Sequence, residues 1–264
     1  MSNPFERLRS LARWSGDDDQ LAGEAALAIA GLAGDPGMVV ACRRMLAHHP
    51  ANARLWWLLA HVLAAPEPRL AARQCMDRLD ADPTATHLAA SLEIQDEGAR
   101  LGIVGWNRTV DLAMSERFDL DVVAIAVEGD DPTSLLRRRT TDRNVRVVEP
   151  WECAAAGVDH LLVVAVALDD CGALVPRGVA DLLWEVGDDV DLWLVGGVGT
   201  VLPHALVAAM LDAIADTESD HPVALERLEF GRVTKVVGLR GAEPPDEAIG
   251  GFTCPLPAEL LRPL

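Results

Sequence analysis

Apolar residues recur every three or four positions from Asn3 to about Arg100, which is the spacing of amphipathic helices. Glycine and proline clusters divide this region, and helices are predicted over Pro4–Trp14, Gln20–Leu32, Met38–His48, Ala53–Leu63, Leu70–Leu79 and Thr86–Ala99. One stretch has the length of a tetratricopeptide-type repeat, but stable arrays need about three repeats. The pattern therefore predicts a helical N-terminal subdomain, residues 1–99, rather than a repeat array.

From Arg100 onward, short apolar runs of strand length alternate with amphipathic segments. Extended segments are predicted over Leu101–Gly105, Asp121–Val127, Val145–Val148, Leu161–Leu168, Val190–Val195, Leu225–Phe230 and Arg232–Leu239. Helices are predicted over Val110–Arg117, Pro132–Arg139, Pro150–Ala156, Val179–Val186 and Thr200–Asp216. Strands that alternate with helices imply a doubly wound, mostly parallel sheet. The predicted fold class is α/β, with a Rossmann-like domain in residues 100–264.

The stretch Val158–Pro203 contains the most regular part of this pattern. Its first apolar run, Leu161–Leu168, is rich in β-branched residues and is predicted as one strand buried on both faces of a parallel sheet. A turn, a helix and a second buried strand follow, and the glycine sequence Gly196–Thr200 is predicted to open the next helix. This β-α-β unit organises the predicted domain.

Composition narrows the classes of partner. The net charge of −18 argues against a nucleic-acid partner and against anionic membranes. No apolar run approaches the ~20 residues that span a bilayer, and the N-terminal residues lack the apolar segment of a secretory signal. The cysteines lack C-x-x-C spacing. A cytoplasmic protein is expected, without a metal site, a disulfide framework, a nucleic-acid partner or a membrane partner.

Candidate chemistry lies in loops after the predicted strands, because open parallel sheets bind ligands at the carboxyl ends of their strands. In the first loop, Arg108 can bind a phosphate while Asn107 and Thr109 add hydrogen bonds. The alternative is that Asn107 caps the helix and Arg108 faces solvent. Both interpretations stay open at this point.

The second loop contains Asp169 and Asp170, which can act as acid and base or hold a metal. Adjacent aspartates before a glycine are also ordinary turn chemistry, and that interpretation is favoured. Arg177 is the better ligand contact of this loop. In the third loop, G-G-V-G-T lacks the spacing of dinucleotide and P-loop motifs, and a tight turn with Thr200 as helix cap accounts for most of it.

The histidines lack ligand spacing and no G-x-S-x-G motif is present, so neither a cofactor nor a catalytic residue is assigned. The predicted phosphate pocket consists of Asn107, Arg108, Thr109, Asp170, Arg177, Gly197, Gly199 and Thr200.

Three stretches together indicate a family. Leu162–Val195 combines a buried strand, a D-x-C-G turn, a P-R-G helix start and a D-x-W-L-V strand. With Leu225–Pro244 and the loop Gly105–Val110, it resembles the regulatory α/β/δ subunits of translation initiation factor 2B. That family also includes methylthioribose-1-phosphate isomerase and ribose-1,5-bisphosphate isomerase. The resemblance covers about the last two-thirds of the chain and implies the fold, an anion pocket and a homodimer formed through the α/β domain.

The isomerases of this family use a cysteine in the first loop and an aspartate in a G-A-D-x-I motif. Trp106 and Val166 stand at the corresponding positions here, and neither side chain transfers a proton. The leading hypothesis is therefore a non-catalytic, initiation-factor-2B-like protein that binds a phosphorylated metabolite or nucleotide.

Two alternatives remain. An isomerase-type enzyme would use relocated groups, Asp169, Asp170 or Cys171, the last with a lowered pKa. A protein-interaction module would instead bind its partner through the N-terminal helices. Trp56 and Trp57 are adjacent on a predicted helix, so one is expected to face the core and the other to be exposed as an anchor for the partner.

Overall fold

The computed structural model describes residues 4–14, 18–93, 99–115, 117, 119–128, 145–216, 224–251 and 253–262. The chain forms two compact units, each built from separated segments. The first, here called the helical unit, contains Met1–Asp82, Val198–Pro222 and Phe252–Leu264. The second, the α/β unit, contains Pro83–Gly197 and Val223–Gly251. The predicted helix Pro132–Arg139 lies outside the described residues.

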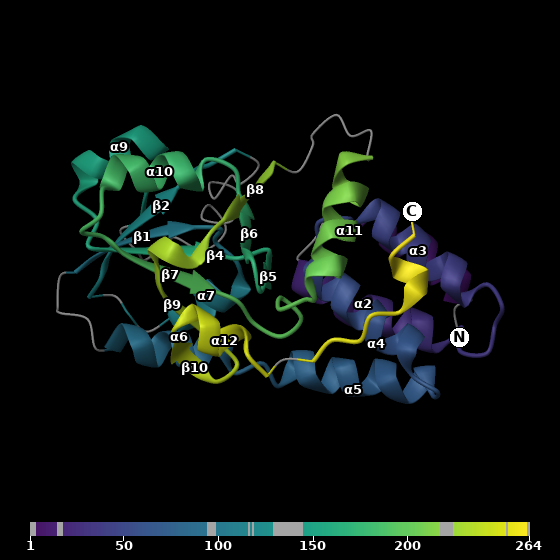
Figure 1. Ribbon diagram of the computed structural model, residues 1–264. Helices are drawn as coiled ribbons and strands as arrows, with labels where there is room; N and C mark the ends of the chain where they lie inside the picture. Colours follow the sequence, from purple (N-terminus) through teal and green to yellow (C-terminus); the bar gives the residue numbers. More distant parts are fainter. Residues whose placement is uncertain are drawn as a thin grey trace. The chain divides into compact units, whose positions relative to one another are not determined.

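The helical unit is formed largely by helices (Figure 1). They are α1 (Pro4–Leu11), α2 (Asp18–Ala30), α3 (Met38–His48), α4 (Ala53–Ala64), α5 (Pro68–Asp80), α11 (His204–Ala215) and the 3-10 helix η2 (Ala258–Leu260). Asn52 caps α4, because its side chain accepts a hydrogen bond from the backbone N–H of Leu55. Trp56 and Trp57 on α4 are both buried, with 0% and 3% of their surface exposed. The expectation that one of them is exposed is wrong, since helices pack on both sides of α4.

The α/β unit contains a seven-stranded sheet in the order β10-β9-β7-β4-β1-β2-β3. Its strands are β1 (Arg100–Val104), β2 (Asp121–Ile125), β3 (Val145–Val148), β4 (His160–Val164), β7 (Asp191–Val195), β9 (Val233–Gly238) and β10 (Gly241–Glu243). All neighbouring strands from β9 to β3 pair in parallel, and β10 pairs with β9 in antiparallel fashion. The predicted doubly wound α/β fold is therefore confirmed.

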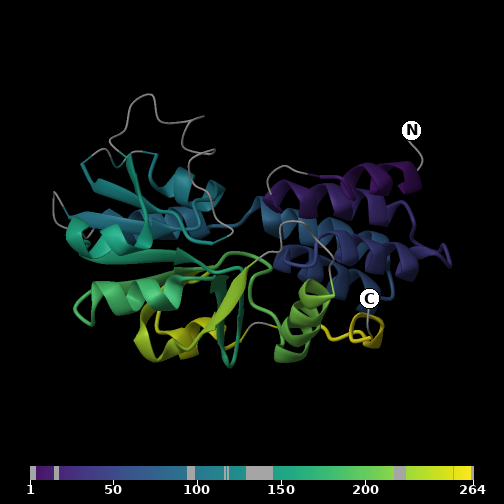
Figure 2. The ribbon, with the colours of Figure 1, turned by 90° about the horizontal axis from the view of Figure 1, so that it is seen from above.

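Helices cover both faces of this sheet (Figures 1 and 2). They are α6 (Thr84–Glu93), α7 (Arg108–Ala113), α9 (Pro150–Ala156), α10 (Val179–Val186), α12 (Pro245–Ile249) and the 3-10 helix η1 (Phe230–Arg232). Helices α9 and α10 pack together on one face, and α6 and α7 pack together on the other. The strand order reverses direction between β1 and β4, so the ends of these two strands mark the switch point of the sheet.

The predicted single strand Leu161–Leu168 is wrong, because this run forms two strands in two sheets. The backbone N–H of Ala165 still bonds to Val195 of β7, at 2.9 Å, whereas that of Val166 bonds to Leu174, at 2.8 Å. The chain thus changes partners between these two residues. Strand β5 (Ala167–Asp169) then forms an antiparallel three-stranded sheet with β6 (Gly172–Pro176) and β8 (Leu225–Leu228). Both strands of the run are buried, so its hydropathy shows no break.

Among the described residues, no helix has both the length and the apolar character that crossing a membrane requires.

Candidate functional site

The loop after β1 packs closely against the end of β4. Gly105 has φ +79°, and a Cβ there would lie 2.9 Å from the Cβ of Val164, so this position requires glycine. The side chain of Trp106 is buried in the core of the α/β unit, with 7% exposed. The side-chain oxygen of Asn107 accepts a hydrogen bond of 3.0 Å from the N–H of Val110. Asn107 is therefore the N-cap of α7, and Arg108 is exposed, as the second interpretation of this loop expected.

Arg177 reaches the same edge of the sheet from the other loop. It is exposed, and its backbone forms an isolated antiparallel bridge with Glu128, which follows β2. The Cβ position of Gly178 lies 3.8 Å from the Cβ of Val127, which places this turn beside the end of β2. Since Arg108 follows β1 and β1 pairs with β2, both arginines lie at the carboxyl ends of adjacent strands. The sequence interpretation missed Glu128, although it directly follows the predicted strand Asp121–Val127.

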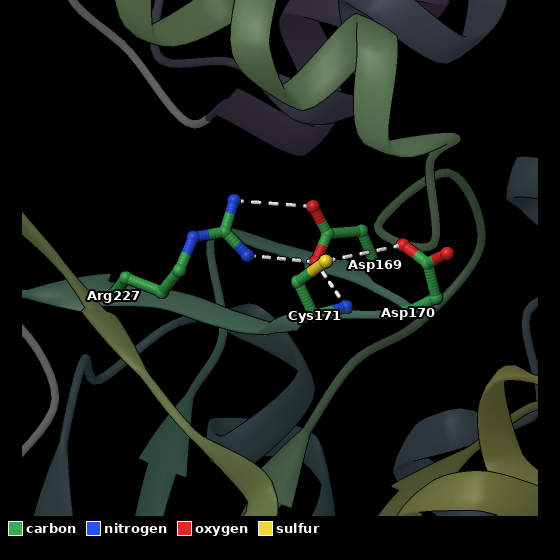
Figure 3. Close-up of polar contacts among 4 residues, drawn as sticks. All are labelled: Asp169, Asp170, Cys171 and Arg227. Atoms are coloured by element: carbon green, nitrogen blue, oxygen red, sulfur yellow. Dashed lines mark hydrogen bonds and ion pairs between the residues drawn. The ribbon is translucent and has the colours of Figure 1, made fainter.

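Asp169, at the end of β5, is a buried structural anchor. Its carboxylate accepts two hydrogen bonds from the guanidinium of Arg227 on β8, at 2.7 and 3.1 Å (Figure 3). It also accepts one from the backbone N–H of Cys171, at 2.9 Å, which closes the turn of the β5–β6 hairpin. Asp169 is thus engaged in the fold, and the turn interpretation accounts for it. Arg227 was missed because it lies 58 positions away in the chain.

Cys171 is an exposed thiol beside two carboxylates. Partial desolvation raises its pKa, and Asp170 and Asp169 raise it further by charge repulsion. The Sγ atom of Cys171 lies 3.6 Å from the carboxylate of Asp170, to which it donates a hydrogen bond (Figure 3). The expectation of a lowered pKa at Cys171 is wrong, because the nearest charges are negative and stabilise the neutral thiol.

Other groups of the protein accept hydrogen bonds from the backbone of the glycine sequence after β7. The N–H of Gly196 bonds to the carbonyl of Val237 at 3.0 Å, within the α/β unit. In the helical unit, the N–H of Val198 bonds to the carboxylate of Asp82 at 2.8 Å. Gly199 has φ +81°, and a Cβ there would lie 3.1 Å from the Cα of Arg54 on α4. The glycine therefore permits close backbone packing, and a carboxylate of the chain binds the N–H group next to it.

Helix α11 begins at His204, after Pro203, so the expectation that it begins at Thr200 is wrong. Thr200 is buried, with 5% exposed, and is separated from the helix by three residues, so it does not cap α11. Gly197 belongs to the α/β unit, whereas Gly199 and Thr200 belong to the helical unit. The third predicted loop thus divides between the two units.

Neither a family model nor a curated protein matches the chain. Solved structures do. Translation initiation factor eIF-2B from Pyrococcus horikoshii OT3 is 14% identical with a TM-score of 0.72, over 94% of this chain and 99% of that one. The tetrameric eIF2B-beta2-delta2 complex from C. thermophilum is 16% identical with a TM-score of 0.66, and the match covers 94% of this chain and 92% of that one. The delta subunit of translation initiation factor eIF-2B from A. fulgidus is 11% identical with a TM-score of 0.60, and the match covers 94% of this chain and 90% of that one.

This chain has the fold of the initiation factor 2B subunits. The resemblance inferred from sequence is confirmed at the level of the fold, at sequence identities of 11–16%. That Trp106 and Val166 occupy the positions of the isomerase acid and base groups stays a prediction from the sequence. Trp106 is buried and Val166 is bonded through its backbone to β6. These two positions contribute packing and backbone pairing.

Arg108 and Arg177 are thus both exposed beyond the carboxyl ends of strands, Arg108 after β1 and Arg177 beside the residue that follows β2. Asn107 serves as a helix cap and Thr109 is buried, so their side chains face the protein. Asp170 is exposed at the tip of the β5–β6 hairpin. Binding of a phosphate by the eight predicted residues stays a prediction.

Proposed function

We propose that this chain is a non-catalytic protein with the initiation factor 2B fold that binds a phosphorylated metabolite or nucleotide and acts in the cytoplasm by assembling with protein partners. The observation that carries the proposal is the composition of the carboxyl edge. Arg108 and Arg177 are exposed there. The sequence resemblance adds the expectation that Trp106 and Val166 replace the acid and base groups of the isomerases. Such an edge offers binding groups for an anion without a matched proton donor and acceptor.

The guanidinium groups suit a phosphate. Arginine is charged at all physiological pH values and presents donors in a fork that matches two phosphate oxygens. Because the chain carries a net charge of −18, non-specific attraction of anions is weak, and binding has to come from groups placed together. Both arginines follow the carboxyl ends of neighbouring strands, β1 and β2, which is the edge of a parallel sheet where ligands bind.

Assembly with another chain is the second part of the proposal. It is supported by the fold shared with a beta and delta subunit complex that is tetrameric. We expect the first partner to be a second copy bound through the α/β unit. Sedimentation velocity over a range of concentrations tests this part, and a monomer at every concentration would remove the homodimer.

One observation favours an isomerase-type enzyme as the second candidate. Glu128 is an exposed carboxylate beside Arg177 on the same edge, so it can act as a base toward an anion bound there. The groups proposed for relocated chemistry from sequence are less suited, since Asp169 is bound to Arg227 and the pKa of Cys171 is raised.

Calorimetric titration with sugar phosphates, nucleoside monophosphates and inorganic phosphate tests the ligand. For any ligand that binds, Arg108→Ala and Arg177→Ala should each weaken binding by about 1.5–3 kcal/mol, the contribution of a hydrogen bond to a charged group. Arg73→Ala on α5 is the matched control, because it removes an exposed arginine from the helical unit. The absence of binding across the panel would remove the ligand. Turnover of a sugar phosphate that Glu128→Gln abolishes would favour the enzyme instead.

A further inference from the structure

Two tryptophans of the α/β unit are exposed to solvent. Trp184 on α10 has 87% of its surface exposed, and Trp151 on α9 has 68%. In contrast, Trp106 and Trp193 of the same unit are buried. A tryptophan that becomes buried removes about 150–250 Å² from water, so leaving two of them exposed is costly unless another molecule covers them.

Both side chains lie on the same outer surface. Helices α9 and α10 pack against each other on one face of the sheet (Figure 1). Each helix turns its buried residues, Cys153 on α9 and Leu182 and Leu183 on α10, toward the protein. Since Trp151 and Trp184 are exposed on these two neighbouring helices, they face away from the sheet together.

The same two helices carry exposed carboxylates. Four exposed acidic residues lie on or next to the two helices: Glu149, Glu152, Asp181 and Glu185. Neither α9 (PWECAAA) nor α10 (VADLLWEV) contains a lysine, arginine or histidine. Of the arginines beside α10, Arg232 is paired with Asp188, and Arg177 precedes the helix by two positions at the carboxyl edge of the sheet. The surface therefore combines exposed indole rings with negative charge.

We propose that Trp151, Trp184 and these four carboxylates form a docking surface for an arginine-rich segment of a partner protein. Guanidinium groups stack on indole rings through cation–π contacts and pair with carboxylates, so arginine satisfies both features of the surface. A second copy placed with the same face against this one would bring like charges together, which opposes association. The inference names the partner chemistry for the assembly part of the proposed function and does not depend on the phosphate site.

The test uses the full chain and a fluorescent peptide of nine arginines, with binding followed by anisotropy. Trp184→Ala and Trp151→Ala should each weaken binding about tenfold, which corresponds to about 1.4 kcal/mol. Neither substitution changes the net charge, so non-specific attraction to an acidic protein stays constant. Leu112→Ala is the matched control, since Leu112 is 49% exposed on α7, on the opposite face of the sheet, and this variant should bind like the unchanged protein.

Charge is tested separately. Glu185→Gln should weaken binding of the peptide, whereas Asp77→Asn, an equal change on α5 of the helical unit, should leave it unchanged. Equal affinity of the tryptophan variants and the unchanged protein would overturn the proposal, because binding would then be general electrostatic attraction. A shift from dimer to monomer in Trp184→Ala would also overturn it, because a second copy would then cover this face. Loss of phosphate binding in Arg108→Ala or Arg177→Ala, with peptide binding intact, separates the two sites.

Discussion

Arg227 and Asp169 form a two-pronged ion pair that joins β8 to the end of β5, across the small antiparallel sheet (Figure 3). The side chain of Asp169 is fully buried, and that of Arg227 is 29% exposed. The hydrogen bonds to Asp169 raise the pKa of Arg227, so the guanidinium stays charged. Because the carboxylate has no access to water, it depends on this partner for its charge to be compensated.

Removing that partner should destabilise the fold. We expect Arg227→Ala to lower the free energy of unfolding by about 3 kcal/mol, the usual effect of removing one member of a buried ion pair. Urea unfolding followed by circular dichroism measures this value. Arg73→Ala removes an exposed arginine and should change the stability by less than about 0.5 kcal/mol. Equal stabilities of the two variants would show that the pair contributes little.

Gly172, at the turn of the β5–β6 hairpin, should not tolerate a side chain. It has φ +144°, and a Cβ there would lie 2.4 Å from the carbonyl oxygen of Leu228. Gly172→Ala must therefore shift β6 away from β8, and we expect a loss of about 3 kcal/mol, at the upper end for local backbone strain. In Gly187→Ala the φ of +80° is strained but nothing lies within 4 Å, so the loss should be about 1–2 kcal/mol. Thermal unfolding of both variants compares the two causes, and similar losses would exclude the close contact as the reason.

Cys171 should react slowly with iodoacetamide at neutral pH although it is exposed, because its pKa is raised and the thiolate is the reactive form. Native-state alkylation read by mass spectrometry measures the rate. Asp170→Asn removes one of the charges that raise the pKa, so it should speed the reaction. Alkylation faster than that of a free cysteine peptide would contradict the raised pKa and would return Cys171 to the list of candidate nucleophiles.

His61 should make the helical unit less stable in mild acid. Burial lowers its pKa below 6.5, and the charge of Arg78 lowers the pKa further. The hydrogen bond that the Nδ1–H donates to the carbonyl of Trp57 opposes this shift without reversing it. The unfolded chain therefore binds more protons than the folded one below pH 6.5, so stability is full above that pH and decreases as the pH falls toward the folded pKa. Urea unfolding between pH 7.5 and 5 should show a weaker pH dependence in His61→Gln. The same substitution at the exposed His48 should leave the dependence unchanged.

The sequence pattern predicted the helices whose ends are determined by neighbouring residues in the chain. The bounds of the helices Met38–His48 and Val179–Val186 agree with the structure, because glycine, proline or a change in periodicity marks each end. The alternation of strands and helices was enough for the doubly wound sheet, since connections in such sheets have one hand. The resemblance to initiation factor 2B rested on the same part of the chain.

The sequence pattern could not predict contacts between residues that lie far apart in the chain. Asp82 binds the N–H of Val198 across 116 positions, and this contact uses a glycine-rich loop that otherwise resembled an anion site. The change of sheet at Ala165 lies inside an uninterrupted apolar run, because burial on both faces hides a change of partner. For the candidate site, sequence predicted the two arginines. It did not predict Glu128 beside Arg177, because that pairing joins two separate loops.

The way in which the helical unit is assembled has a consequence for synthesis on the ribosome. Helices α1 to α5 emerge first, but α11, which packs on α4, and the segment Phe252–Leu264 belong to the same unit and emerge much later. Domains usually complete in the order in which they are made. In this chain the first helices must wait, with part of their apolar surface uncovered, until nearly all of the α/β unit has been made. Helix α4 is therefore made early but reaches its final packing only after α11 has been made.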